Sequence, residues 1–188
     1  KKFSLPENFL LYVGDATWNK NLPRLIEAAR KTKRKLVLVG KVWAPSEQIG
    51  SNSWNNDLRF VLEKIENDEQ FLKLGFVPGE DLVKIYNLAT TLIMPSVYEG
   101  FGLPVLEAMS CGCPVITTRE GSLPEVAGDA VLYVDPERQE SIKKGIEKIF
   151  TEPKLRSELA KKGFEQSKRF SIEKMMRDLI NTYEETYR

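Results

Sequence analysis

Histidine is absent from this chain of 188 residues, and cysteine occurs only twice. Without histidine, Ser-His-Asp and Cys-His catalytic triads and histidine-based zinc sites are excluded. Cys111 and Cys113 are too close in sequence for an ordinary disulfide, and nothing supplies further soft ligands for a metal. Any chemistry must therefore use carboxylates, lysine, arginine, hydroxyl groups or backbone amides. A reducing compartment is the simplest interpretation.

The chain also has little excess charge and no long apolar run. Its formal net charge is +1, so no global field favours nucleic acid or an anionic membrane. No apolar run approaches the ~18 residues of a membrane span, and no signal peptide is visible. The hydrophobic fraction of 41% is that of a globular protein. The abrupt start, "KKFSLPENFLLYVG", suggests a piece of something longer.

Short apolar runs alternate with helical patterns along most of the chain. The runs are rich in Val, Ile and Leu and predict buried strands at 9–14, 35–40, 71–77, 91–96, 114–118 and 130–135. The helix candidates lie at 21–33, 56–67, 80–89, 104–112 and 122–128. This alternation predicts an α/β fold with a doubly wound parallel sheet of about six strands.

After Asp135 the sequence pattern becomes purely helical. We therefore expect a single domain over 1–188, with a βα core at 1–135 and C-terminal helices at 136–188. The final helix carries an apolar stripe, which core packing explains better than a partner or lipid surface; its members are Ile172, Met176, Leu179, Tyr183 and Tyr187. The polar stretch 41–56 predicts a mobile loop.

The segment "YEGFGLPVLEAM" at 98–109 combines two glutamates with a glycine-rich turn before a helix. Pro104 suits the first helical turn, which leaves the amides near Gly102 free for a phosphate. Glu107 lies about one turn further on, and its side chain leans back toward the ligand, where it could accept hydrogen bonds from two ribose hydroxyls. Glu99, on the approach loop, suits the hydroxyls of a group beyond the phosphate, such as a sugar. Lys20 follows the first strand and would supply the cation that a diphosphate requires.

Taken singly, each of these residues has a simpler explanation. A glutamate in a loop is usually solvated, a lysine near a helix start usually lies at the surface, and "GFG" alone is a turn. The pattern G-x-G-x-x-G is absent after the first strand, which disfavours a nicotinamide-linked Rossmann enzyme.

Together, the motifs resemble those of a known family. The segment "PSVYEGFGLPVLEAMSCGCPVITT" resembles the E-x7-E signature region of family 4 glycosyltransferases, which are retaining enzymes of the GT-B type. "LLYVGDATWNKNLPRLIEAA" is similar to that family's first strand and diphosphate loop, and "LGFVPGEDLVKIYNLATTLIMPS" to its base-binding turn and next helix. "GSLPEVAGDAVLYVDP" and "FSIEKMMRDLINTYEETY" are similar to its later segments. The resemblance covers almost the whole chain.

The resemblance implies a role for each matching position. Glu99 corresponds to the glutamate that contacts the donor sugar at the reaction centre, Glu107 to the ribose ligand and Lys20 to the diphosphate lysine. The remaining positions that we expect to bind the nucleotide sugar are Gly14, Gly40, Phe76, Val77, Pro78, Gly100, Phe101, Gly102 and Leu103. Asp15 departs from the pattern, because many relatives have arginine there. A carboxylate beside a diphosphate is repelled, so either Asp15 turns away or the clamp depends more on Lys20.

The resemblance also implies what this chain lacks. It matches the C-terminal, Rossmann-like donor half of a GT-B fold, so acceptor recognition belongs to an absent N-terminal domain. The implied reaction is retaining transfer of a hexose from a GDP or UDP donor to a glycan or lipid-linked acceptor, without metal or other cofactor. The expected location is cytoplasmic, and peripheral association of the full-length enzyme with the inner face of the membrane is compatible with it. A non-catalytic nucleotide-binding regulatory module is the alternative.

Overall fold

The computed structural model describes residues 2–44 and 56–187. Six parallel strands form one sheet in the order β3-β2-β1-β4-β5-β6. Their bounds are β1 Leu10–Val13, β2 Leu36–Val39, β3 Phe71–Gly75, β4 Thr91–Met94, β5 Val115–Thr117 and β6 Leu132–Tyr133. The strand order confirms the prediction of a doubly wound parallel sheet, with the change of direction between β1 and β4.

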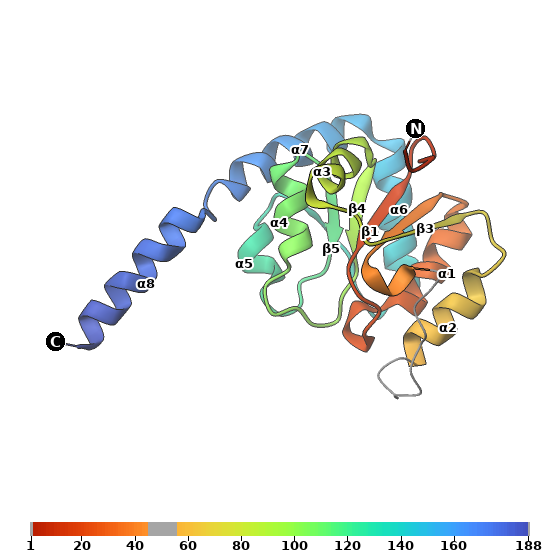
Figure 1. The fold of residues 1–188 in the computed structure, drawn as a ribbon. Helices are drawn as coiled ribbons and strands as arrows, with labels where there is room; N and C mark the ends of the chain where they lie inside the picture. The colour runs from red at the N-terminus through yellow and green to blue at the C-terminus, as the bar shows by residue number, and fades with distance from the viewer. Residues whose placement is uncertain (1, 45–55, 188) are drawn as a thin grey trace.

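Helices cover both faces of the sheet (Figure 1). Their bounds are α1 Leu22–Thr32, α2 Asn56–Ile65, α3 Gly79–Leu88, α4 Leu103–Ser110, α5 Leu123–Ala127, α6 Gln139–Thr151, α7 Pro153–Ser167 and α8 Ile172–Thr186. Two short 3-10 helices, η1 Trp18–Lys20 and η2 Lys41–Trp43, follow β1 and β2. None of the helices in the described ranges is long and apolar enough to cross a bilayer.

Alternation along the strands divides the core into two layers. Leu10 and Leu38 pack with apolar residues of α1, α2 and α6. Leu11 and Val39, their neighbours in sequence, pack on the other face with residues of α3, α4 and α5. Because successive strand side chains point to opposite faces, a strand covered on both sides must be apolar throughout. This explains why β1, β2 and β4 read as continuous apolar runs.

The predicted loop at 41–56 is wrong at both ends, and its middle, 45–55, lies outside the described residues. Lys41–Trp43 forms η2, and the Trp43 side chain is buried. Its indole packs edge-on against Tyr12, and Nε1 donates to the backbone oxygen of Gly14 over 3.1 Å. A large ring with a single polar atom is well placed here because that atom finds a partner. At the other end, Asn56 begins α2.

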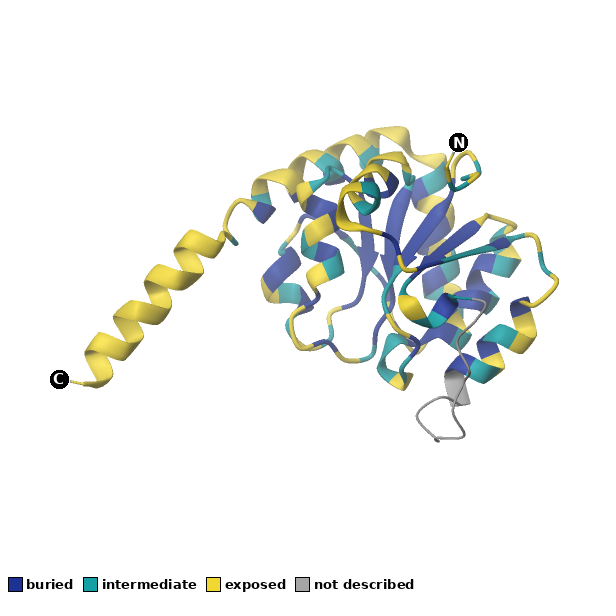
Figure 2. Ribbon diagram, in the orientation of Figure 1, coloured by how far each residue is buried: buried dark blue, intermediate teal, exposed yellow. Residues whose placement is uncertain are grey.

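The prediction that the stripe on the last helix packs in the core is also wrong. α8 extends away from the rest of the molecule (Figure 1), and all of it is exposed (Figure 2). The exposed fractions of the residues in the stripe range from 45% for Met176 to 89% for Tyr187. Helical periodicity shows that one face is apolar, but it does not show whether the same chain covers that face.

Because α8 buries no residue, it should add little to the stability of the domain. We expect a chain ending at Ser171 to unfold in urea with a free energy within about 0.5 kcal/mol of the full chain. The control is Leu159→Ala in α7, a buried side chain whose loss should cost about 2–4 kcal/mol. A loss above about 1 kcal/mol on truncation would show that α8 packs against the domain in solution.

Candidate functional site

The carboxyl ends of β1 and β4 meet where the strand order reverses, which is where ligands bind in open α/β sheets. The backbone at this edge is tightly packed. Gly14 and Gly40 have φ angles of +146° and +151°, and a Cβ on Gly40 would lie 2.4 Å from the backbone oxygen of Gly14. Glycine at position 40 is therefore required by the contact between the ends of β1 and β2.

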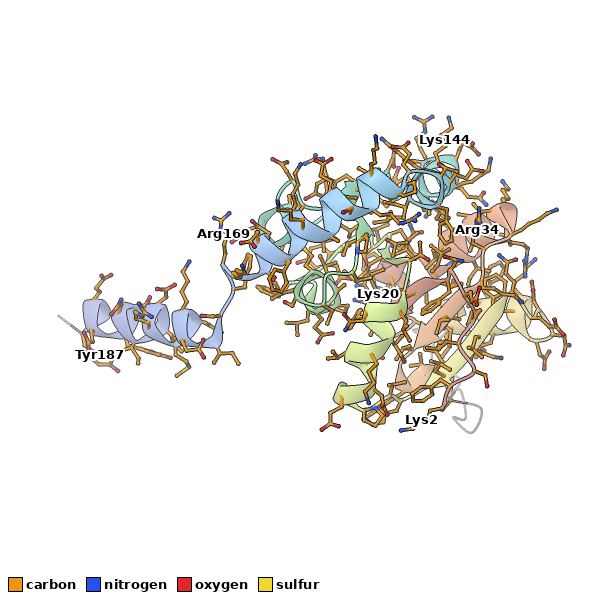
Figure 3. All side chains as sticks on the ribbon, turned by 90° about the horizontal axis from the view of Figure 1, so that it is seen from above. Lys2, Lys20, Arg34, Lys144, Arg169 and Tyr187 are labelled. Atoms are coloured by element: carbon orange, nitrogen blue, oxygen red, sulfur yellow. The ribbon has the colours of Figure 1, made fainter. Side chains whose placement is uncertain are left out.

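Lys20 and Glu99, both predicted from the sequence, come together at this edge. Lys20 ends η1, and its Nζ lies 2.7 Å from Oε1 of Glu99 in the loop between β4 and α4. Their side chains are 18% and 8% exposed, so water screens this pair less than a surface ion pair. In the view of Figure 3, Lys20 projects over the centre of the domain, whereas Lys2, Lys144 and Arg169 lie at its outline.

Ser96 completes this buried cluster, and its role was not predicted. Its hydroxyl donates to Oε1 of Glu99 over 2.6 Å, and Ser96 is fully buried. Its own backbone oxygen accepts a hydrogen bond of 2.6 Å from Thr118, which follows β5. Its position two residues after β4, a strand that ends at the ligand edge, is the feature of the sequence that could have indicated this role.

The backbone of Glu99 is held by the loop that precedes α5. Ser122 donates to the Glu99 backbone oxygen through its amide at 3.2 Å and its hydroxyl at 3.3 Å. Gly121 has φ +59°, and a Cβ there would lie 2.3 Å from the same oxygen. Only glycine fits a left-handed position in such close contact with another backbone.

Asn21 is a second unpredicted residue of the site. It is 4% exposed, and its Nδ2 donates to the backbone oxygens of Pro95 and Pro136 at 3.0 and 2.7 Å. Next to it, Asn19 bonds to the loop after β4, accepting from the amide of Val97 and donating to the backbone oxygen of Tyr98. The two asparagines tie the Lys20 segment to the loop that carries Glu99.

The start of α4 has the predicted form. Gly102 is the N-cap with φ +86°, and Pro104 occupies the first turn. In the described part of the chain, no recorded hydrogen bond uses the amides of Gly100, Phe101, Gly102 or Leu103 as donors. Free amides at a helix N-terminus attract an anion through direct hydrogen bonds and the helix dipole.

Glu107 lies apart from the Lys20–Glu99 pair, on the exposed side of α4. It lines an open groove of about 440 Å³ between α3 and α4, together with Gly79, Leu82, Val83, Tyr86 and Leu106. Tyr86 Oη donates to Glu107 Oε2 over 2.9 Å. Burial, with a smaller effect of Glu107, raises the pKa of Tyr86 far above its usual value, so the phenol stays a donor at neutral pH. This contact was also not predicted.

The predicted base-binding turn lies between β3 and α3. Phe76 is 65% exposed, with Lys41 Nζ 5.8 Å from its ring centre, and Pro78 is the N-cap of α3. Val77 is buried in the core, so only its backbone could meet a ligand.

Asp15 is exposed. Its backbone oxygen accepts a bond of 2.6 Å from Tyr12 Oη, and no recorded side-chain hydrogen bond or ion pair of the described residues involves its carboxylate. Lys20 is a cation that the structure places against the Glu99 loop.

Comparison with known proteins identifies the family to which this chain belongs. Residues 1–166 match the family model of glycosyl transferases group 1. The chain belongs to this family. It is 36% identical over 178 residues to the O-antigen chain mannosyltransferase B of Escherichia coli, covering 94% of this chain and 46% of that protein. The chain thus spans about half the length of this relative.

Solved structures of glycosyltransferases share the fold of this domain. The C-terminal domain of a group 1 protein (LpcC) from Francisella tularensis superposes with a TM-score of 0.71 and 24% identity, over 88% of this chain and 87% of that one. HepE from Anabaena, in complex with UDP-glucose, superposes with a TM-score of 0.77 and 19% identity, over 95% of this chain and 49% of that one. The domain is therefore the C-terminal half of a GT-B fold.

The buried position of the Lys20–Glu99 pair in this glycosyltransferase domain leads to a stability prediction. Lys20→Met removes the cation and leaves a largely buried carboxylate with Ser96 as its remaining side-chain donor. We expect a loss of about 1–3 kcal/mol in the free energy of unfolding, measured in urea at neutral pH.

The matched control for this variant is Lys162→Met, which breaks the pair between Lys162 and Glu158, both more than half exposed. It should change stability by less than about 0.5 kcal/mol. Equal effects of the two substitutions would mean that the Lys20–Glu99 pair contributes no more than a surface pair.

Proposed function

We propose that this chain binds a nucleotide-diphosphate hexose, with GDP or UDP as the nucleotide, as the donor half of a retaining hexosyltransferase. The observation that carries the proposal is the buried Lys20–Glu99 pair beside the free N-terminus of α4, with Glu107 further along that helix. The arrangement offers a cation and amides for two phosphates, and one carboxylate on either side of them.

The ligand would lie along the carboxyl edge of the sheet. The phosphates would accept hydrogen bonds from Lys20 and from the amides of Gly102 and Leu103, which attract anions. The ribose would reach Glu107 in the groove between α3 and α4, and the base would meet the turn at Phe76–Pro78. The sugar would lie at Glu99, on the other side of the phosphates.

The chemistry follows from where negative charge develops. When the bond between the sugar and the diphosphate breaks, the leaving nucleotide gains charge, and Lys20 and the helix N-terminus would stabilise it. Glu99 would contact the sugar at the reaction centre. No step in this scheme requires a metal.

The activity named for the E. coli relative supports a glycan product. Because the E. coli protein is an O-antigen chain mannosyltransferase, we propose a mannosyl or glucosyl donor and a glycan or lipid-linked acceptor. The half that this chain does not span would bind the acceptor and complete the cleft, so this half alone should be inactive in transfer. A location in the cytoplasm, at the inner face of the membrane, would suit such an enzyme.

Thermal unfolding with a panel of ligands tests the proposal. GDP, UDP, their hexose conjugates and NAD would each be added at saturating concentration. The cognate nucleotide and nucleotide sugar should stabilise the chain by roughly 2.7 kcal/mol at about 100 times the dissociation constant. Stabilisation by NAD and by no nucleoside diphosphate would contradict the proposal.

Two substitutions should separate the ends of the ligand. Glu107→Ala should weaken nucleoside diphosphate binding by roughly 1–3 kcal/mol, because ribose hydroxyls lose their acceptor. Glu99→Ala should not weaken nucleoside diphosphate binding, since Lys20 loses a competing partner, but it should weaken binding of the full nucleotide sugar. Isothermal titration calorimetry with both ligands would measure the difference.

Glu147→Ala serves as the control for both variants, since this residue lies on α6, which packs against α1 on the opposite face of the sheet from α4. It should bind both ligands like the parent chain. Equal losses for both ligands in Glu99→Ala would show that Glu99 does not act specifically on the sugar.

A further inference from the structure

The carboxylate of Glu99 is held on one of its two oxygens. Oε1 accepts from Lys20 Nζ at 2.7 Å and from Ser96 Oγ at 2.6 Å. Among the described residues, no hydrogen bond or ion pair reaches Oε2 of Glu99. Two donors on one oxygen fix the plane of the carboxylate, and the other oxygen remains available as an acceptor.

The two donors, Lys20 and Ser96, differ in how strongly a bound diphosphate would attract them away from Glu99. The ammonium of Lys20 is attracted to any anion near it, so a diphosphate competes with Glu99 for it. The hydroxyl of Ser96 is neutral and has a single hydrogen to donate. The Ser96 hydroxyl is therefore attracted to the diphosphate less strongly than the Lys20 ammonium is, and it stays on the Glu99 carboxylate.

The backbone of Ser96 cannot easily move. The residue is fully buried, and its backbone oxygen accepts from Thr118 Oγ1 at 2.6 Å. The residue before it, Pro95, is tied through its backbone oxygen to Asn21 Nδ2 at 3.0 Å. The serine hydroxyl is thus presented to Glu99 from a fixed position at the end of β4.

We propose that Ser96 is a positioning residue of the sugar subsite. It holds Oε1 of Glu99 while Lys20 turns to the diphosphate, so that Oε2 accepts a hydrogen bond from a hydroxyl of the donor sugar. This rests on the proposed function of the site and adds a residue and a specific oxygen atom to it. The ligand class is the hexosyl group of a nucleotide-diphosphate sugar.

The test compares two affinities in one variant. Ser96→Ala should weaken the binding of the cognate nucleotide sugar about tenfold, which corresponds to about 1.4 kcal/mol, and change that of the nucleoside diphosphate less than twofold. A loss of packing alone would lower both affinities together. The ratio of the two dissociation constants, measured by calorimetry, is therefore the decisive quantity.

Three further variants make the test specific. Thr117→Val removes a comparable buried hydroxyl, one that donates to the backbone oxygen of Met94 at 2.9 Å, and it should leave the ratio unchanged. Ser96→Cys keeps a weak donor and should give an intermediate ratio. In a Glu99→Ala background, Ser96→Ala should have no further effect on sugar binding, since the carboxylate that it orients is gone.

The outcomes separate this inference from the function on which it rests. If the parent chain binds no nucleotide sugar, the proposed function and the role of Ser96 both fail. If the parent binds but Ser96→Ala leaves the ratio unchanged, or lowers both affinities equally, only the role of Ser96 is overturned. A loss that persists in the Glu99→Ala background would also overturn it.

Discussion

The ion pair between Lys20 and Glu99 joins two segments that lie 79 residues apart in the chain and follow adjacent strands. Placing both charges in a nearly closed position requires hydrogen-bond partners around them, because an isolated buried charge is very costly. Ser96, Asn19 and Asn21 supply such partners to the carboxylate and to the loops around it. Much of the backbone geometry at this edge follows from that requirement.

The glycines at positions 40 and 121 are explained by contacts between backbones rather than by ligand access. Gly121 lies against the backbone oxygen of Glu99, and Gly40 against that of Gly14. Both are contacts between protein backbones that bring successive loops close enough to share hydrogen bonds. Gly100 has open space around it, so its place in the predicted phosphate loop owes nothing to packing. The candidate site therefore contains glycines that backbone packing requires, Gly40 and Gly121, and one that packing does not require, Gly100.

Much of the fold was predictable because it depends on local patterns. Continuous apolar runs marked strands buried on both faces, and Pro104 after Gly102 marked the start of α4. Lys20 and Glu99 were found as separate candidates, but their pairing depends on the sheet order, which no local pattern contains. The contacts of Ser96, Asn21 and Tyr86 were missed for the same reason. The stripe of α8 shows the opposite error, since its period was correct and its burial was not.

The two glutamates differ in solvation, and this difference bears on how such a ligand would be recognised. Glu99 is desolvated and held in place by folding itself, so a sugar hydroxyl that reaches Oε2 meets an acceptor whose ordering cost has already been met. Glu107 is exposed, with one oxygen bonded to Tyr86, and a ribose hydroxyl would replace water there. Hydrogen bonds exchanged with water contribute a modest net free energy, about 0.5–1.5 kcal/mol for a neutral pair and up to about 3 kcal/mol when one group is charged. The proposed sugar end would therefore be the preorganised end, and the proposed contact with the ribose would gain strength as the ligand itself excludes water from the groove between α3 and α4.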